Sequence, residues 1–150
     1  MNYATIMLKN AIRMKASAKT LADEILRIAL TSYDTVNWRE GTMGQVEAIS
    51  NLSAEIDECN SFYNAVKQAL LSIPKKYAVL LVKVYFKRAD KELLATKYGV
   101  SRSTVYRKLF AAREMFGKTL NLLGFTEDWF YEHYAHYDFI TNEPYHKRKK

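Results

Sequence analysis

The sequence predicts an all-α protein, and three observations support this fold class. Only two prolines and five glycines occur in 150 residues, which favours long helices over a loop-rich or β-sheet fold. Apolar residues recur in alternating steps of three and four along two long stretches, as in a coiled-coil seam. Residues 90–109 have the pattern of two short helices joined by a tight turn. We therefore expect a long antiparallel helical hairpin, a three-helix domain with a helix-turn-helix, and an aromatic-rich C-terminal helix.

Residues 1–73 form the predicted hairpin. The connector is expected from Thr31 to Gly44, where no period is sustained, and Ile12, Leu26 and Ala29 add apolar surface beside the seam. The hairpin is either a dimerisation or docking arm, with that extra surface facing a second subunit, or the completion of a monomer's core. Cys59 is expected to be a small buried hydrophobe. The first seam consists of Ala4, Met7, Ala11, Met14, Ala18, Leu21, Ile25 and Ile28, and the second of Ile49, Leu52, Ile56, Cys59, Tyr63, Val66, Leu70 and Ile73.

Residues 74–124 form the predicted helix-turn-helix domain. Pro74 suits the first turn of a helix, where its missing amide is no loss. Ala78, Val79, Leu81, Val82 and Tyr85 make this helix strongly apolar, so it is expected to support the two helices that follow.

The helix-turn-helix is predicted from local chemistry. Leu93, Leu94 and Ala95 give its first helix an apolar side, and Gly99 tolerates the left-handed backbone of a helix end. Ser101 is a good N-cap for the second helix. Val105, Leu109 and Ala112 fall on one face and would pack inward. The second helix is expected to continue past Phe116 toward Gly124, with Gly117 as an earlier end or a bend.

The outward face of the second helix is polar and basic, and a helix presented in this way can lie in the major groove of DNA. The alternative is an ordinary pair of helices with a solvated basic face. The predicted base-contacting residues are Arg102, Ser103, Tyr106 and Arg107, and the predicted phosphate-contacting residues are Lys91, Lys97, Ser101, Thr104, Lys108 and Arg113.

The net charge of +7 is concentrated in the same segment. Residues 74–116 carry eleven basic and three acidic groups, a balance of +8, whereas residues 45–73 have a balance of −3. Attraction to phosphates predicts such a localised excess.

Residues 125–150 form the predicted aromatic segment and basic tail. Thr126 can cap a short helix, with Glu127 and Asp128 favourable at its positive end. Phe130, Tyr134 and Tyr137 would share one side of this helix. The whole set of rings, Trp129, Phe130, Tyr131, Tyr134, Tyr137, Phe139 and Tyr145, is too apolar to stay in water and is expected to pack on its own domain, a second subunit or a partner. The tail at 146–150 is either a phosphate contact or a solvated end.

No arrangement of residues predicts catalysis, so the chain is not expected to be an enzyme and no cofactor is expected. There is no glycine loop that could cradle a phosphate. Glu132, His133 and His136 could meet on one helical face as metal ligands, but the His133–His136 pair lacks a third well-placed ligand, so no metal site is expected. The single cysteine fits a reducing cytoplasm. No membrane span and no signal peptide are expected.

The run from Leu70 to Phe116 resembles region 4 of bacterial sigma factors. The likeness lies in Leu70 to Pro74, Val79 to Phe86 and Leu93 to Leu109. It implies that the recognition helix binds promoter DNA and that the segment touches RNA polymerase. A coiled-coil hairpin before such a module also resembles small phage and prophage transcriptional regulators. The chain before residue 70 is too short for the segment with which a sigma factor melts DNA, so a self-sufficient initiation factor is not expected.

The sequence therefore predicts a cytoplasmic, sequence-specific transcriptional regulator of phage or prophage type that binds double-stranded promoter or operator DNA. RNA polymerase, or a second copy bound through the hairpin, would supply a second foothold. The alternative is a protein-interaction adaptor that works through the hairpin and the aromatic tail, with little specific DNA binding.

Overall fold

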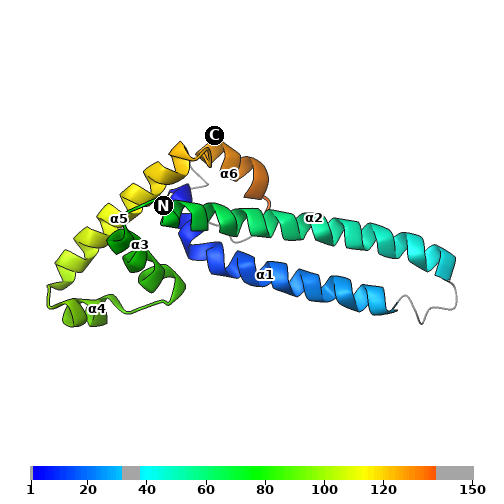
Figure 1. Ribbon diagram of the computed structural model, residues 1–150, viewed down its shortest axis with the longest axis horizontal. Helices are drawn as coiled ribbons and strands as arrows, with labels where there is room; N and C mark the ends of the chain where they lie inside the picture. Colours follow the sequence, from blue (N-terminus) through cyan, green and yellow to red (C-terminus); the bar gives the residue numbers. More distant parts are fainter. Residues whose placement is uncertain (1, 32–37, 138–150) are drawn as a thin grey trace. The chain divides into compact units, whose positions relative to one another are not determined.

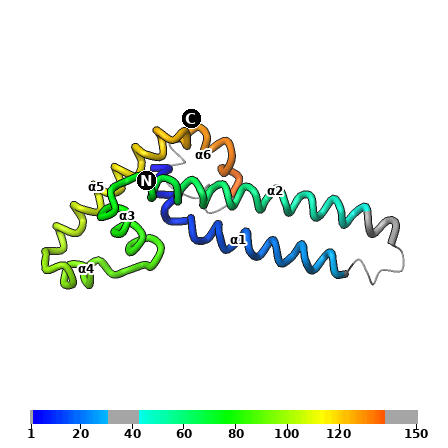
Figure 2. The backbone as a smooth tube through the Cα atoms, in the orientation of Figure 1, coloured from blue at the N-terminus to red at the C-terminus, as the bar shows by residue number. Residues whose placement is uncertain are grey.

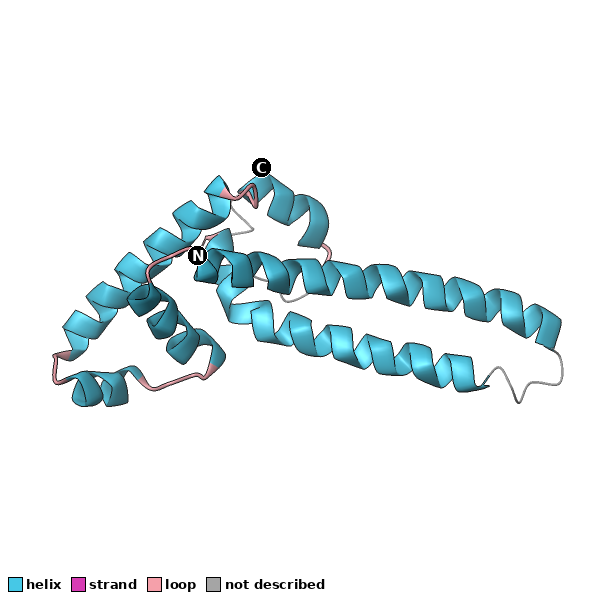
Figure 3. Ribbon diagram, viewed as in Figure 1, coloured by secondary structure: helices cyan, strands magenta, loops and turns pink. Residues whose placement is uncertain are grey.

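The described part of the chain contains six α-helices, one π-helical turn and no strand, so the predicted all-α fold is confirmed (Figure 3). The computed structural model describes residues 2–31 and 38–137 (Figure 1). No helix within these ranges combines the length and the apolar character that crossing a membrane would require.

From α2 onward, short connections join consecutive helices (Figure 2). Two are long, α1 with 29 residues and α2 with 34. In chain order the elements are α1 (Tyr3–Thr31), α2 (Trp38–Leu71), α3 (Lys75–Leu81), the π-helical turn η2 (Val82–Phe86), α4 (Lys91–Tyr98), α5 (Arg102–Leu122) and α6 (Glu127–Tyr134).

The predicted connector from Thr31 to Gly44 was too long. Thr31 still belongs to α1, and α2 begins at Trp38, so Gly41 and Gly44 lie inside a helix. A glycine within a helix costs about 1 kcal/mol relative to alanine. The good helix formers around these two glycines offset that cost. The remaining connector residues, 32–37, lie outside the described ranges.

Contacts between residues divide the chain into two compact units. Unit 1 comprises Met1–Ala11 and Asn64–Lys150, and unit 2 comprises Ile12–Tyr63. Both boundaries fall inside the long helices α1 and α2. The units are groupings of contacts, so the predicted domains, 1–73, 74–124 and 125–150, stay predictions.

Unit 2 joins the later part of α1 to the earlier part of α2. Met14, Ala18, Cys59 and Phe62 are buried, and the Lys15 ammonium lies 4.8 Å from the centre of the Tyr63 ring. Between residues 19 and 30, and between 43 and 58, every side chain is half-buried or exposed. Part of the predicted seam is therefore buried, and the rest of it is half-buried. Cys59 is a buried hydrophobe, as predicted.

Unit 1 has a continuous apolar core. Its buried side chains come from every helix of the unit, among them Ile6, Leu81, Leu94, Leu109, Phe116, Leu120, Phe130 and Tyr134. The first turns of α1 belong to this core. The Tyr3 hydroxyl donates a 2.8 Å hydrogen bond to the backbone oxygen of Phe125, and the Tyr3 and Phe130 rings lie 5.8 Å apart.

Helix α5 passes straight through Gly117 and ends at Leu122, close to the more distant of the two predicted ends. A Cβ atom at Gly117 would lie 3.6 Å from the Cβ of Ala4, an ordinary contact distance. Gly124 follows with a φ of 95°, a left-handed conformation that glycine adopts without strain. This places the stop signal at Gly124 rather than at Gly117.

The aromatic C-terminal helix α6 begins as predicted. The Thr126 hydroxyl accepts a 3.2 Å hydrogen bond from the amide of Trp129, and Phe130 and Tyr134 are buried. The Tyr137 ring, just beyond the helix, lies 6.3 Å from the Tyr134 ring. The segment thus packs within unit 1. Phe139, Tyr145 and the basic tail lie outside the described residues.

Helix α3 differs from its prediction at both ends. Pro74 precedes the helix as its N-cap, with extended φ and ψ of −55° and 141°, and does not occupy the first turn. Val82 and Tyr85 lie in the π-helical turn, where the Lys87 amide bonds to the Val82 oxygen at 3.0 Å. Leu80, Leu81 and Val84 face the core, whereas Val79 is 38% exposed.

Candidate nucleic-acid interface

The two ends of α4 are fixed by local hydrogen bonds. Asp90 is its N-cap, and one side-chain oxygen accepts from the amide of Glu92 at 3.0 Å. Gly99 ends the helix with φ of 66° and ψ of 34°, as predicted. The Val100 amide then bonds to the Ala95 oxygen at 3.0 Å, which satisfies a carbonyl that the helix end would leave open.

Only part of the predicted apolar side of α4 is buried. Leu94 and Ala95 are buried against the core, but Leu93 is 68% exposed. Neighbouring positions on a helix point about 100° apart. An eight-residue helix that turns Leu94 and Ala95 inward therefore turns Leu93 toward solvent. The prediction for Leu93 was wrong.

Helix α5 begins at the predicted cap. The Ser101 hydroxyl accepts a 3.2 Å hydrogen bond from the amide of Thr104 and lies 2.9 Å from the Thr104 hydroxyl. Val105, Leu109 and Ala112 are buried, as predicted from their spacing. The opposite side of the first two turns is consequently held toward solvent.

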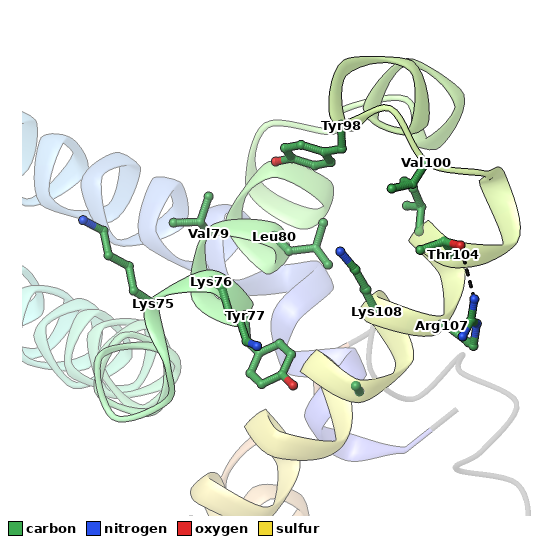
Figure 4. Close-up of a pocket in the computed structure, with 12 residues that line it drawn as sticks. Lys75, Lys76, Tyr77, Val79, Leu80, Tyr98, Val100, Thr104, Arg107 and Lys108 are labelled. Atoms are coloured by element: carbon green, nitrogen blue, oxygen red, sulfur yellow. Dashed lines mark hydrogen bonds between the residues drawn. The ribbon is translucent and has the colours of Figure 1, made fainter.

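All four predicted base-contacting residues, Arg102, Ser103, Tyr106 and Arg107, lie on that exposed side. Arg102 donates to the Tyr106 hydroxyl at 3.4 Å, and its guanidinium lies 5.5 Å from the ring centre. Arg107 instead donates to the Thr104 hydroxyl at 3.2 Å (Figure 4). The two arginines are therefore held in different ways.

The predicted phosphate-contacting residues are less uniform. Lys97, Ser101 and Lys108 are exposed. Lys91 is half-buried, and its ammonium lies 5.7 Å from the Tyr106 ring centre. Thr104 is also half-buried and takes part in the cap.

Arg113 stands apart from the other predicted phosphate contacts. It is half-buried and donates a 3.2 Å hydrogen bond to the Tyr85 hydroxyl of η2. This bond ties α5 to the π-helical turn, 28 residues earlier in the chain. Its phosphate contact stays a prediction.

The charges of the basic residues of α4 and α5 are not balanced by ion pairs with carboxylates among the described residues. The pKa of Arg102 is raised above its ordinary value, chiefly by the hydrogen bond to Tyr106 and further by the nearby Glu92 and Asp90 carboxylates. These interactions favour the charged guanidinium.

The polar contacts of two tyrosines were not predicted from the sequence. Tyr98 accepts a 2.7 Å hydrogen bond from the Lys83 ammonium, and Tyr85 holds Arg113. Each pair joins residues from different helices, so no local spacing could have revealed it. Arg88 was also missed as a special position, because its φ of 53° is unusual for a residue with a side chain.

The possible metal ligands Glu132, His133 and His136 do not come together into a site. Among the described residues, no group of three or more histidines, cysteines or carboxylates could hold a metal ion. The Nδ1 atom of His133 lies 2.8 Å from the Trp129 backbone oxygen, and its ring lies 5.5 Å from the Trp129 ring. His133 therefore packs on its own helix.

In comparisons with known proteins, no family model, no curated protein and no solved structure matches this chain. The resemblance to sigma region 4 therefore rests on the quoted residues alone and stays a prediction.

Proposed function

We propose that this protein is a sequence-specific transcriptional regulator that inserts the first two turns of α5 into the major groove of double-stranded DNA. The observation that carries the proposal is the two-sided character of α5. Val105 and Leu109 anchor one side in the core, while Arg102, Tyr106 and Arg107 stand exposed on the other.

The chemistry of the exposed side suits base recognition. Arginine can donate two hydrogen bonds to the O6 and N7 atoms of guanine, and each such pair is worth about 1–3 kcal/mol of discrimination. Arg102 donates a hydrogen bond to the Tyr106 hydroxyl, and Arg107 donates one to the Thr104 hydroxyl. Both guanidinium groups are therefore held against α5, the helix that would enter the groove.

The surrounding cations suit phosphate contacts. Lys97 and Lys108 are exposed, and no carboxylate pairs with them in the described ranges. Phosphate contacts fix the register of a helix on the duplex without reading its sequence. A single recognition helix needs a second binding contact. RNA polymerase, or a second copy of the chain on a paired half-site, would supply it.

The proposal is tested by selecting duplexes that bind the full chain from a random library at moderate salt. One sequence motif should be enriched. Arg102→Ala and Arg107→Ala should each relax the preference at particular bases. The control is Lys19→Ala, an exposed cation in unit 2, which should leave both motif and affinity unchanged. Equal losses on every duplex would reassign the arginines to phosphates.

Salt dependence tests the phosphate contacts separately. Lys97→Ala should weaken binding on all duplexes and reduce the slope of log affinity against log salt by about 1. An unchanged slope would remove Lys97 from the interface. Failure to enrich any motif at all would contradict the proposed function.

A second candidate function, a protein-interaction adaptor, is favoured by one observation in unit 2. Several large apolar side chains there are exposed, including Leu26 at 60% and Met43 at 75%. An adaptor would bind a protein through this surface and show little preference among duplexes. The selection experiment separates the two functions.

A further inference from the structure

A hollow of about 700 Å³ lies within unit 1, between α3, the turn after α4, and α5 (Figure 4). Small-molecule sites in proteins have volumes of about 300–1,000 Å³. Its lining residues are Lys75, Lys76, Tyr77, Val79, Leu80, Tyr98, Val100, Thr104, Val105, Arg107, Lys108 and Ala111.

The interior of the hollow is apolar and aromatic. Leu80 of α3 points toward Val100 and α5 in Figure 4, and Val79, Val105 and the tyrosines Tyr77 and Tyr98 also line the hollow. The Tyr98 hydroxyl is already occupied by the Lys83 ammonium at 2.7 Å, so this ring is held in place. A ligand with a flat apolar body would gain the most from such walls.

The rim of the hollow is positively charged. The lining cations are Lys75 and Lys76 of α3 and Arg107 and Lys108 of α5; the Lys108 ammonium points toward Leu80 in Figure 4, whereas Arg107 turns to the Thr104 hydroxyl. None of the twelve lining residues is acidic. An anionic group of a ligand would therefore be attracted by the four lining cations and repelled by no lining carboxylate.

We propose that the hollow binds a small organic anion with a ring-containing apolar body, and that its occupant competes with DNA. The second part rests on the proposed function, because Thr104, Arg107 and Lys108 line the hollow and also belong to the predicted DNA-contacting set. An anion held by Arg107 and Lys108 neutralises charges that the duplex would need. By linkage, DNA then weakens the binding of the anion by the same factor.

A small ligand fits the hollow better than a docked helix does. A helix with its side chains is about 10–12 Å across, and three turns of it would need a long groove. The hollow is instead confined between short stretches of three helices, all of them in unit 1.

The probe for the test is anilinonaphthalene sulfonate, which is anionic and aromatic and fluoresces on entering apolar sites. The full chain should bind one molecule saturably. Phenylnaphthylamine, which has a similar ring body without the sulfonate, should bind at least about tenfold more weakly, since it gains nothing from the rim. Equal binding of the two probes would overturn the assignment of an anion.

Two variants locate the bound probe. Val79→Glu places a carboxylate in the hollow and should weaken binding of the sulfonate by about tenfold or more. Leu122→Glu is the matched control, because Leu122 is exposed in the same unit but does not line the hollow. Should Val79→Glu fail to fold, Lys76→Glu makes the same test at an exposed side chain. Equal binding by these variants and the control would place the probe elsewhere and overturn the site.

The link to DNA is tested with a duplex enriched in the selection. Adding the duplex should release the probe from the parent protein, and the probe should weaken DNA binding by an equal factor. Simultaneous binding of both would overturn the competition but leave the site standing. If no duplex binds at all, the proposed function fails, and the variant series still decides the site.

Discussion

Units 1 and 2 contain helices of the same kind but bury their apolar residues very differently. In unit 1 the buried side chains form one core to which α3, α5, α6 and the first turns of α1 contribute. In unit 2, no side chain between residues 19 and 30 or between 43 and 58 is fully buried.

The difference shows how the number of helices in a unit affects the burial of its apolar side chains. A helix in a protein derives most of its stability from packing its apolar face. In unit 1 several helices contribute buried side chains to one core. Two helices alone can shield only one side of each other, so a seam such as Leu52 and Ile56 stays half-buried. Unit 2 therefore depends more on helix propensity, or on a further surface, than unit 1 does.

The largest expected effect on the free energy of unfolding comes from replacing a leucine by alanine, and we compare this substitution in the two units. Leu109→Ala, at a side chain 1% exposed, should lower the free energy of unfolding by about 2–5 kcal/mol. Leu52→Ala, at a half-buried side chain, should lower it by about 1 kcal/mol. Urea unfolding followed by circular dichroism measures both.

Equal losses at Leu109 and Leu52 would show that another surface covers the seam in solution. In that case, repeating the Leu52→Ala measurement at several protein concentrations shows whether a second copy of the chain covers the seam. A loss that grows with concentration means that a second copy covers it.

A smaller effect on stability is expected when two glycines are replaced by alanine, and its sign should differ between the two units. Gly44 and Gly99 both have open space where a Cβ would lie, but only Gly99 has a left-handed φ. Gly99→Ala should destabilise unit 1 by about 1–2 kcal/mol. Gly44→Ala should stabilise the α2 helix by up to about 1 kcal/mol. Thermal unfolding gives both signs, and a loss at Gly44 would mean that its helix is not formed in solution.

The smallest effect tests whether the start of α1 belongs with unit 1. Tyr3→Phe removes the hydrogen bond to Phe125 and should cost about 0.5–1.5 kcal/mol at neutral pH. Burial, and to a lesser extent the Glu127 carboxylate, raises the pKa of Tyr3 above its ordinary value of 10.0. The folded state therefore holds this proton more tightly than the unfolded chain does.

The stabilisation linked to that proton is present below pH 10 and is lost as the pH rises further. Unfolding measured from pH 8 to 11 should show a smaller alkaline loss in Tyr3→Phe than in the parent protein. An identical pH profile in the two proteins would mean that the first turn of α1 is detached in solution.

The features that the sequence predicted well are those decided by a few neighbouring residues. Ser101, Gly99 and Thr126 end or begin helices as predicted, because a cap depends on its own backbone and on an amide three residues away. The alternation of apolar residues likewise predicted the buried face of α5.

The features that the sequence predicted poorly depend on distant partners. The inward or outward direction of Leu93 is set by how α4 rests on the core, and the bond between Arg113 and Tyr85 spans 28 residues. The hollow beside α5 combines α3 with a turn more than twenty residues later. Neither periodicity nor charge counting contains that information.

The hydrogen bond between Tyr3 and Phe125 joins residues separated by 122 positions. During synthesis at about 5–20 residues per second, Tyr3 is added to the chain roughly 6–24 seconds before Phe125. Throughout that interval the apolar side chains at the start of α1, Ile6, Met7 and Leu8, have no finished core to enter. The nascent chain is therefore expected to bind a chaperone, or to pack these side chains temporarily against α2, until α5 and α6 have emerged.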